Sequence, residues 1–390
     1  MLGFLRNRSM PIALDLGGDS VKMLQLKRSG SGVVVSACGK WRVPDALRGD
    51  PAQRRSATVA AVREMLHRNG FRGRRVCSSL SCSDLSIKNI RLPSLGPADL
   101  AQAILDEARD RLGLDVSPDR LSYLHAGQVR QGNDTREEVI LLGAPQAVID
   151  DHVGLLEEMG LRVQHVDAEP IALFRIFERR LRRSSDEQSV SVIADVGFRA
   201  SRVLVARGRQ IVFVKSIDIG GSRFTEAVAK QLNMPPAEAA ELRLRQAREN
   251  RTPSARNALG DATKGASADS IAWTLYDAIR GEVDLLGKEI ALCLRYCSVT
   301  FRGVRPSGVV LTGGEAHDPA VVSLLGEHLN MPCSVGQPLR GIDVSAVDLG
   351  GDRRSNLAEW TLCAGLAARD SEMPAERSED EDGNRDRLSA

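Results

Sequence analysis

The stretch Ile12–Leu26 reads IALDLGGDSVKMLQL, and it decides the fold. An apolar run ends at Asp15, a Gly17-Gly18 turn follows, and apolar and polar residues then alternate from Val21 onward. Alternation with period two after the glycines predicts a second strand, so the stretch is a β-hairpin. A Walker loop or a dinucleotide fingerprint needs a helix behind its glycines, and both are therefore excluded.

The turn of this hairpin can bind a phosphate group. Gly17 and Gly18 allow backbone N–H groups to turn inward, Ser20 adds a hydroxyl, and Lys22 adds a positive charge. Asp15, at the end of the first strand, is of the kind that binds Mg²⁺ through its waters. The alternative is an ordinary Asp-Gly-Gly turn without a ligand, which this stretch taken alone favours.

The hairpin is repeated later in the chain. After a shift of 180 residues, VIADVGFRASRVLVA (Val192–Ala206) aligns with IALDLGGDSVKMLQL without a gap, so that Asp195 falls on Asp15 and Gly197 on Gly17. An internal repeat predicts two like halves, each opening with a strand–turn–strand unit. Two facing Asp-Gly turns can hold one polyphosphate between them, and this is the central hypothesis.

Two further elements carry candidate ligand-binding residues. The apolar run Val309–Leu311 predicts a strand that ends at Gly313 and Gly314, where the missing side chains allow close approach of a flat ligand such as a nucleoside. Glu169 follows another predicted strand and opens a helix, where a carboxylate can orient a metal-bound or attacking water. Taken alone, each element is more often an ordinary strand-to-helix connection that binds no ligand.

These motifs together resemble the actin-like ATPase superfamily: Asp-x-Gly at both half-starts, Glu-Pro before a helix, Gly220-Gly221, and a late Thr-Gly-Gly. Within it, the chain is most similar to the PilM family of type IV pilus assembly proteins. The similarity spans roughly residues 1–369 and rests on MLGFLRNR, PIALDLGGDSVK, VDAEPIALFRIFE, KSIDIGGSRFTEAVAKQL and VVLTGGEAHDPAVVSLLGEHLNMPCSVGQPLRGI. It implies a two-lobed α/β fold, actin-like (ribonuclease H-like), with an inserted α+β subdomain of the FtsA/PilM type.

The expected domains follow from this resemblance and from the pattern of elements. The first lobe begins in 1–74, the inserted α+β subdomain covers 75–166, and 167–369 completes the first lobe and forms the second. The polar stretch 248–270 is predicted to be a mobile insertion, and the acidic tail 370–390 to be disordered. Helices are predicted over 54–68, 97–112, 145–159, 169–183, 223–232, 235–246, 271–297 and 318–329, and the inserted region adds strands over 76–80, 85–92, 121–126, 137–142 and 161–166.

The resemblance implies that ATP and Mg²⁺ bind between the two halves. On one side the ligand would contact Asp15, Gly17, Gly18, Ser20 and Lys22, and on the other Asp195, Gly197 and Ser201. Gly313 and Gly314 would lie near the nucleoside, Glu169 near the attacking water, and Asp15 and Asp195 would hold Mg²⁺ through its waters. Two departures from the family pattern stand out: Phe198-Arg199 makes the second turn bulky, and Glu315 stands where a glycine is frequent. Arg199 either contacts phosphate or fills the site.

The implied function is that of a cytoplasmic ATP-binding scaffold in a type IV pilus or competence-type assembly machine. It would dock the N-terminal peptide of a PilN-like inner-membrane protein and so associate peripherally with the inner face of the cytoplasmic membrane; self-association is also compatible with the resemblance. The alternatives are an active ATPase, a small-molecule kinase or an FtsA-like filament former that recruits membrane-associated partners. The resemblance leaves ATP hydrolysis open and implies at most a weak ATPase.

The amino-acid composition limits the classes of binding partner and the cellular compartment that we expect. The net charge is +2, from 53 basic and 51 acidic residues, and only 4% of residues are aromatic, so a nucleic acid is not the expected partner. The seven cysteines form no Cys-x-x-Cys and the six histidines have no metal-ligand spacing. No signal peptide or membrane-spanning run is visible, and we expect a cytoplasmic protein.

Overall fold

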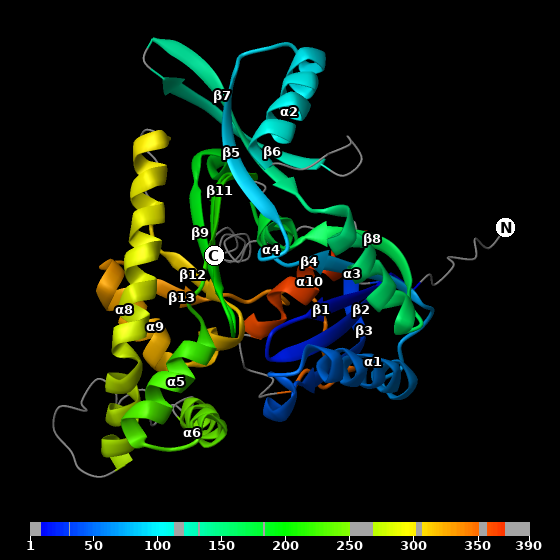
Figure 1. The fold of residues 1–390 in the computed structure, drawn as a ribbon, viewed down its shortest axis with the longest axis vertical. Coiled ribbons are helices and arrows are strands. Elements are labelled where there is room, and N and C mark those ends of the chain that lie inside the picture. Colours follow the sequence, from blue (N-terminus) through cyan, green and yellow to red (C-terminus); the bar gives the residue numbers. More distant parts are fainter. Residues whose placement is uncertain are drawn as a thin grey trace, which may run out of the picture.

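The computed structural model describes residues 9–30, 32–112, 121–131, 133–181, 184–249, 268–301, 306–350 and 357–370 (Figure 1). Most of the predicted mobile insertion, 248–270, and nearly all of the predicted disordered tail, 370–390, lie outside the described residues. Among the described helices, none combines the length and apolarity that crossing a lipid bilayer requires.

The first of two five-stranded sheets contains the hairpin that opens the chain. Its strand order is β3-β2-β1-β4-β8, with β1 antiparallel to β2 and the last two strands parallel to β1. The predicted hairpin is confirmed, because Asp15 pairs with Lys22 across the turn. The bounds are β1 Ile12–Leu16, β2 Ser20–Ser29, β3 Gly32–Arg42, β4 Arg75–Leu80 and β8 Arg162–Ala168.

The second five-stranded sheet has the same topology, in the order β11-β10-β9-β12-β13. Its register also repeats, because Asp195 pairs with Arg202 as Asp15 pairs with Lys22, each residue shifted by 180 positions. The internal repeat predicted from the sequence is therefore confirmed at the level of single residue pairs. The bounds are β9 Val190–Val196, β10 Ser201–Arg207, β11 Gln210–Ile217, β12 Val309–Thr312 and β13 Cys333–Val335.

A third sheet lies at the top of Figure 1 and joins the core of the second sheet through Ala126, Val129 and Ile140. It has the order β5-β7-β6, is antiparallel throughout, and packs one face on α2 (Pro97–Leu112) through Ile104 and Ala108. Its strands are β5 Ser86–Pro93, β6 Leu121–Gln131 and β7 Asp134–Gly143. The sequence grouped β4 and β8 with this region over 75–166, but both strands pair in the first sheet beside β1. We therefore propose a narrower inserted module built on residues 86–143.

Helices cover both large sheets and form separate cores. Apolar residues of β1, α1 and α3 form one core on the first sheet, and α5, α8 and α9 pack on the second. One helix, α4, lies between the sheets: Ala172 and Ile176 contact the core of the first sheet, and Leu173 and Phe174 contact that of the second. The bounds are α1 Pro51–Arg68, α3 Gln146–Glu158, α4 Glu169–Glu178, α5 Gly221–Leu232, α6 Pro236–Glu249, α8 Ala268–Thr300, α9 Pro319–Leu329 and α10 Thr361–Ala367.

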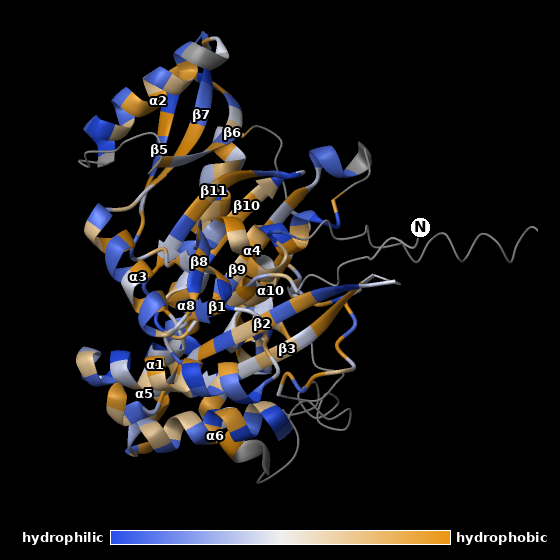
Figure 2. Ribbon diagram, turned by 90° about the vertical axis from the view of Figure 1, so that its right-hand side faces the viewer, coloured by the Kyte–Doolittle hydropathy of each residue, from blue (hydrophilic) through white to orange (hydrophobic). Residues whose placement is uncertain are grey.

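Helix ends differ from the sequence predictions where local capping decides them. The first helix, α1, starts three residues early because the Asp50 carboxylate accepts a hydrogen bond from the Gln53 N–H at 3.0 Å, with Pro51 at the first helical position. By contrast, α4 ends at Glu178, short of the predicted 183. Figure 2 shows polar and apolar residues alternating along α2 and α6.

Candidate functional site

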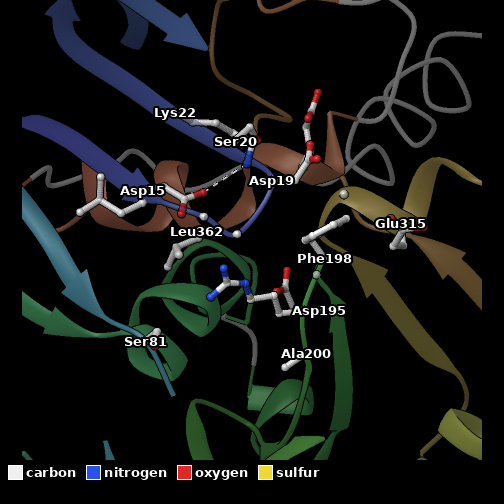
Figure 3. Close-up of a pocket in the computed structure, with 18 of the residues that line it drawn as sticks. Asp15, Asp19, Ser20, Lys22, Ser81, Asp195, Phe198, Ala200, Glu315 and Leu362 are labelled. Carbon is white, nitrogen blue, oxygen red and sulfur yellow. Dashed lines mark hydrogen bonds and ion pairs between the residues drawn. The ribbon is translucent and has the colours of Figure 1, made fainter. Parts of the chain in front are cut away.

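A cleft of about 820 Å³ lies between the turns of the two repeated hairpins. Figure 3 shows Asp15, Ser20 and Lys22 on one side of it and Asp195, Phe198 and Ala200 on the other. Ten of the eleven residues singled out from the sequence line this cleft: Asp15, Gly17, Gly18, Ser20, Lys22, Glu169, Asp195, Gly197, Gly313 and Gly314.

The first turn combines a buried ion pair with a backbone that excludes side chains. Lys22 Nζ lies 3.3 Å from Asp15 Oδ2, and both side chains are less than 10% exposed. Burial alone would lower the pKa of Lys22, but the carboxylates of Asp15 and Glu359 outweigh burial and raise the pKa above its ordinary value. A Cβ on Gly17 would lie 2.7 Å from the Ser20 carbonyl oxygen, so the turn requires glycine there.

The second turn repeats the geometry of the first. A Cβ on Gly197 would lie 2.8 Å from the Ala200 carbonyl oxygen, and the Gly197 N–H donates to that oxygen at 3.2 Å. Two N–H groups at the start of α5, those of Gly221 and Ser222, donate to the carbonyls of Gly197 and Phe198. The start of α5 therefore supports the turn, and these two N–H groups are not available to an anion.

Ser201 does not belong to the cleft, and the expectation that it faces the ligand is wrong. Its side chain is completely buried, and its hydroxyl donates to the Ile219 carbonyl oxygen at 2.6 Å. The physical reason is the strand alternation, because the 180-residue shift places Ala200 on Ser20 and Ser201 on the core residue Val21. In this half Ala200 occupies the cleft position, without a hydroxyl.

Arg202 joins two of the predicted acidic residues into one buried cluster. Its Nε donates to Glu169 Oε2 at 3.1 Å, its Nη2 forms an ion pair with Glu169 Oε1 at 3.0 Å, and its Nη1 lies 3.6 Å from Asp195 Oδ2. Burial raises the pKa of both Glu169 and Asp195, and Arg202 opposes that rise at each. Because Arg202 occupies the register position of Lys22, each half carries an Asp–cation pair at its turn.

Both carboxylate oxygens of Glu169 are engaged. Oε2 accepts hydrogen bonds from Arg202 Nε and, at 2.7 Å, from the Cys82 N–H, and Oε1 is paired with Arg202 Nη2. A residue that orients an attacking water must offer a lone pair in the direction of the reacting phosphorus. Glu169 lines the cleft with its carboxylate paired to Arg202, which competes with a water for the carboxylate oxygens.

The two predicted glycines after β12 have different roles. Gly313 has φ of +86°, and a Cβ on it would lie 2.5 Å from the Val196 carbonyl oxygen, so the backbone itself requires glycine. Gly314 has no heavy atom within 4 Å of its missing Cβ, and it leaves open space beside the cleft. Close approach of a flat ligand is therefore possible at Gly314.

Glu315 is neutralised by a buried arginine. Arg243 of α6 donates through Nη2 to Glu315 Oε2 at 2.6 Å and to Asp318 Oδ2 at 3.1 Å, and through Nη1 to Thr225 Oγ1 at 3.1 Å. The Glu315 carboxylate lies against Gly221, where even a methyl group would overlap it. Glu315, which departs from the family pattern, is thus balanced by an ion pair with an arginine from another helix.

The bulky second turn contacts the first. The Phe198 ring packs under Arg48, whose guanidinium carbon lies 4.1 Å from the ring centre, and Arg199 lies over Gly18. Arg199 lines the cleft, and within the described chain it has no hydrogen bond or ion pair. Arg54 of α1 donates a hydrogen bond to the Gly17 carbonyl oxygen at 3.0 Å and so stabilises the first turn.

Three arginines of this site were missed from the sequence. A signal for Arg202 was present, because the repeat aligns it with Lys22. No local signal marks Arg54 or Arg243, which reach their partners from α1 and α6, 37 and 72 residues away from Gly17 and Glu315.

The carboxylates fit Mg²⁺ only together with a phosphate ligand. The described residues include no group of three or more His, Cys, Asp or Glu that can hold a metal ion. Asp15 and Asp195 face the cleft from opposite turns, and Mg²⁺ is commonly held by one or two carboxylates, waters and substrate phosphates. The donor set is therefore suited to a metal that arrives with a polyphosphate.

Comparisons with known proteins agree with this architecture. The model of the family described as type IV pilus assembly protein PilM matches residues 13–251. A chain of a PilM–PilN type IV pilus biogenesis complex superposes with a TM-score of 0.70 at 21% identity, over 92% of this chain and 98% of that one. The ethanolamine utilization protein EutJ from Carboxydothermus hydrogenoformans superposes with a TM-score of 0.52 at 11% identity, over 93% and 90%. The predicted fold class, the actin-like ATPase fold, is confirmed.

Proposed function

The chain belongs to the family of type IV pilus assembly protein PilM, and on that premise we propose that it is an ATP-binding scaffold of pilus assembly. Its partner is the N-terminal peptide of a PilN-like inner-membrane protein, which holds it at the cytoplasmic face of the membrane. One observation carries the proposal: the fold superposes on nearly the whole of a chain from a PilM–PilN complex.

The cleft supports nucleotide binding through its two turns. Backbone N–H groups of the glycine turns, together with Lys22 and Arg199, would contact the phosphates, and the open space at Gly314 would admit the nucleoside. Three carboxylates and two cations meet at the centre of the cleft, namely Asp15, Asp195, Glu169, Lys22 and Arg202, which leaves one net negative charge. A polyphosphate therefore needs Mg²⁺ to offset repulsion from Asp15 and Asp195.

Binding without rapid turnover is the mode that the side chains favour. Glu169 would be the residue to orient an attacking water, but its carboxylate is paired with Arg202 and its Oε2 already accepts the Cys82 N–H, so both compete with a water. The nucleotide would then stabilise one arrangement of the lobes, which is a shift of population rather than a metabolic reaction. An active ATPase or an FtsA-like filament former has no comparable feature in its favour.

The inserted three-stranded sheet is the proposed docking module. Its strand β5 is an edge strand of the order β5-β7-β6, and an edge strand can accept an extended peptide by main-chain hydrogen bonding. This placement leaves the cleft free, so peptide and nucleotide can bind at the same time and influence each other through the lobes.

Calorimetry with a synthetic peptide tests the proposal. The peptide carries the N-terminal cytoplasmic residues of the PilN-like protein of the same organism, and a scrambled peptide is the control. We expect saturable binding to the full chain, tighter with ATP and Mg²⁺ than without. Absence of binding in both conditions would contradict the scaffold function, whatever the cleft binds.

A further inference from the structure

The long helix α8 carries an exposed apolar stripe. Eight large apolar side chains are exposed in the described chain, and six of them belong to α8: Ile271, Trp273, Leu285, Leu292, Tyr296 and Val299. The adjoining face of α8 is buried in the core of the second sheet through Leu275, Ile279, Val283, Leu286 and Ile290. Figure 1 shows α8 along the outer edge of the molecule.

The stripe has a seven-residue period. The exposed residues Ile271, Leu285, Leu292 and Val299 lie seven or fourteen positions apart, and the half-buried Ala278 fills the position between the first two. Tyr296 lies on the same face but packs on Phe213 and donates to Glu138 Oε1 at 3.2 Å, while Trp273 points elsewhere. At a rise of about 1.5 Å per residue the stripe is about 42 Å long. Scattered exposed apolar residues are ordinary, but a row of exposed apolar residues with this period is typical of a helix that packs on another helix.

The two halves of the stripe complement each other in size. The neighbouring row reads Thr274, Gly281, Lys288 and Arg295, small in the first half of the helix and long in the second. A Cβ on Gly281 would have no heavy atom within 4 Å, so nothing inside the chain requires glycine there, although glycine weakens a helix interior. A partner that approaches closely at Gly281 supplies the missing reason.

The two halves of the stripe also complement each other in charge. Asp277 and Arg295 are 18 residues apart, which is five helical turns, so they lie on the same edge of the stripe. Within the described chain, Arg295 and Lys288 have no carboxylate partner, and Asp277 accepts only a hydrogen bond from Gln231 Nε2 at 3.3 Å. The midpoint between Asp277 and Arg295, residue 286, nearly coincides with the midpoint of the stripe, Leu285.

We propose that a second copy of this chain docks on the stripe, with the two α8 helices antiparallel about a two-fold axis near Leu285. In this pairing the small half of each helix receives the large side chains of the other, and Asp277 of each copy faces Arg295 of the other. A parallel pairing would set this edge against the other edge of the partner helix and lose both complementarities. A contact about 42 Å long and one helix, about 10 Å, wide is small for a protein interface, so the dimer is weak and reversible.

Sedimentation velocity on the full chain across the micromolar range tests the dimer. We expect a monomer–dimer equilibrium in the wild type and only monomer for Leu292→Glu, because a carboxylate at the seam would be buried without a partner. Leu95→Glu is the matched control, since Leu95 is a similarly exposed leucine outside α8, and its dimer constant should equal that of the wild type. A wild type that stays monomeric throughout would overturn the proposal and leave the stripe to a different protein.

A mixing experiment tests the antiparallel register. Asp277→Arg and Arg295→Asp each create two like-charge contacts in their own homodimer, and we expect each to weaken dimerisation roughly tenfold or more. Mixed in equal amounts, the two variants restore both ion pairs, and the heterodimer should form with wild-type affinity. Neither misfolding nor a parallel pairing produces this recovery, so a mixture that stays monomeric would refute the register.

Discussion

Removing the Arg202 side chain should expose how the centre of the cleft is stabilised. Arg202 donates one hydrogen bond to Glu169 at 3.1 Å, forms an ion pair with its other oxygen at 3.0 Å, and lies 3.6 Å from Asp195. In Arg202→Met, Glu169 keeps only the Cys82 N–H and Asp195 keeps the Thr312 hydroxyl, at 2.9 Å. Breaking a buried pair by removing one partner costs about 3–5 kcal/mol, and that is the loss we expect in the free energy of unfolding.

The double variant separates the ion pair from the loss of packing. Glu169→Gln removes the charge but keeps an oxygen for the Cys82 N–H, and we expect it to cost about 1–2 kcal/mol. In Arg202→Met/Glu169→Gln the uncompensated charge on residue 169 is gone, so the double variant should be more stable than Arg202→Met alone. The coupling energy between the two positions should be about 2–3 kcal/mol.

Thermal and urea unfolding, followed by circular dichroism, measure these differences. Arg68→Met is the control, because Arg68 pairs only with Glu64 on the exposed face of α1 and its loss should fall within about 0.5 kcal/mol. A loss below about 1 kcal/mol for Arg202→Met, or additive losses in the double variant, would refute the view that Arg202 compensates Glu169.

Three other features give measurable outcomes. Lys40 and His317 hold the pKa of the buried Glu359 at about 2 against the opposing effect of burial, so Glu359→Gln should lose about 3 kcal/mol at neutral pH. Because the folded pKa lies below the unfolded value of about 4.5, the gap in unfolding free energy between wild type and Glu359→Gln should close as pH falls from about 4.5 to 2, and a gap independent of pH would contradict the assignment. Gly365→Ala should destabilise by about 3 kcal/mol or more in thermal unfolding, since its Cβ would lie 1.8 Å from the Ala172 carbonyl oxygen, while Gly154→Ala, a helical glycine with open space, should be neutral or stabilising; equal effects would refute the close approach of α10 to α4. Burial raises the pKa of Cys38, Cys293 and Cys333 to about 11 and of Cys77 and Cys297 to about 12, so a thiol reagent at pH 8 should react with these cysteines far more slowly in the native protein than in the unfolded one, and fast labelling of the native protein would contradict their burial.

The parts of the fold that the sequence predicts well are those with local patterns. The alternation after Gly17 and the glycine turn specify a hairpin, and the gapless repeat carries that hairpin and its register to Asp195. The helix predicted over 318–329 is likewise present as α9, where Asp318 caps the first turn by accepting from the Ala320 N–H at 3.0 Å. In each case the residues that decide the structure lie within a few positions of one another.

The errors arise where distant segments decide the structure. The strands β4 and β8 read as part of the insert because their pairing with β1 is parallel and non-local, and no turn joins them. The helix α10 was not predicted, since its sequence TLCAGLA has no amphipathic pattern and depends on the close approach of Gly365 to Ala172. Its residues Cys363 and Ala364 are completely buried.

In the candidate site, too, local patterns were predicted and contacts between distant segments were not. Ten cleft residues were predicted because their motifs are local or repeated, whereas the burial of Ser201 follows from an alternation that the alignment itself contains. The roles of Glu169 and Glu315 could not be predicted, because each depends on an arginine from another element, Arg202 of β10 and Arg243 of α6. Side-chain partners over such distances are set by the packing of the lobes.

The most direct test of the two-turn cleft is calorimetric titration of the full chain with ATP, with and without Mg²⁺. The wild type is compared with Asp15→Ala and Asp195→Ala, and with Asp151→Ala, an exposed carboxylate on α3 outside the cleft, as the matched control. We predict Mg²⁺-dependent binding in the wild type and the control, and its loss in both cleft variants, because each turn supplies one of the two carboxylates. Binding that survives in either cleft variant, or no binding by the wild type, would contradict the account.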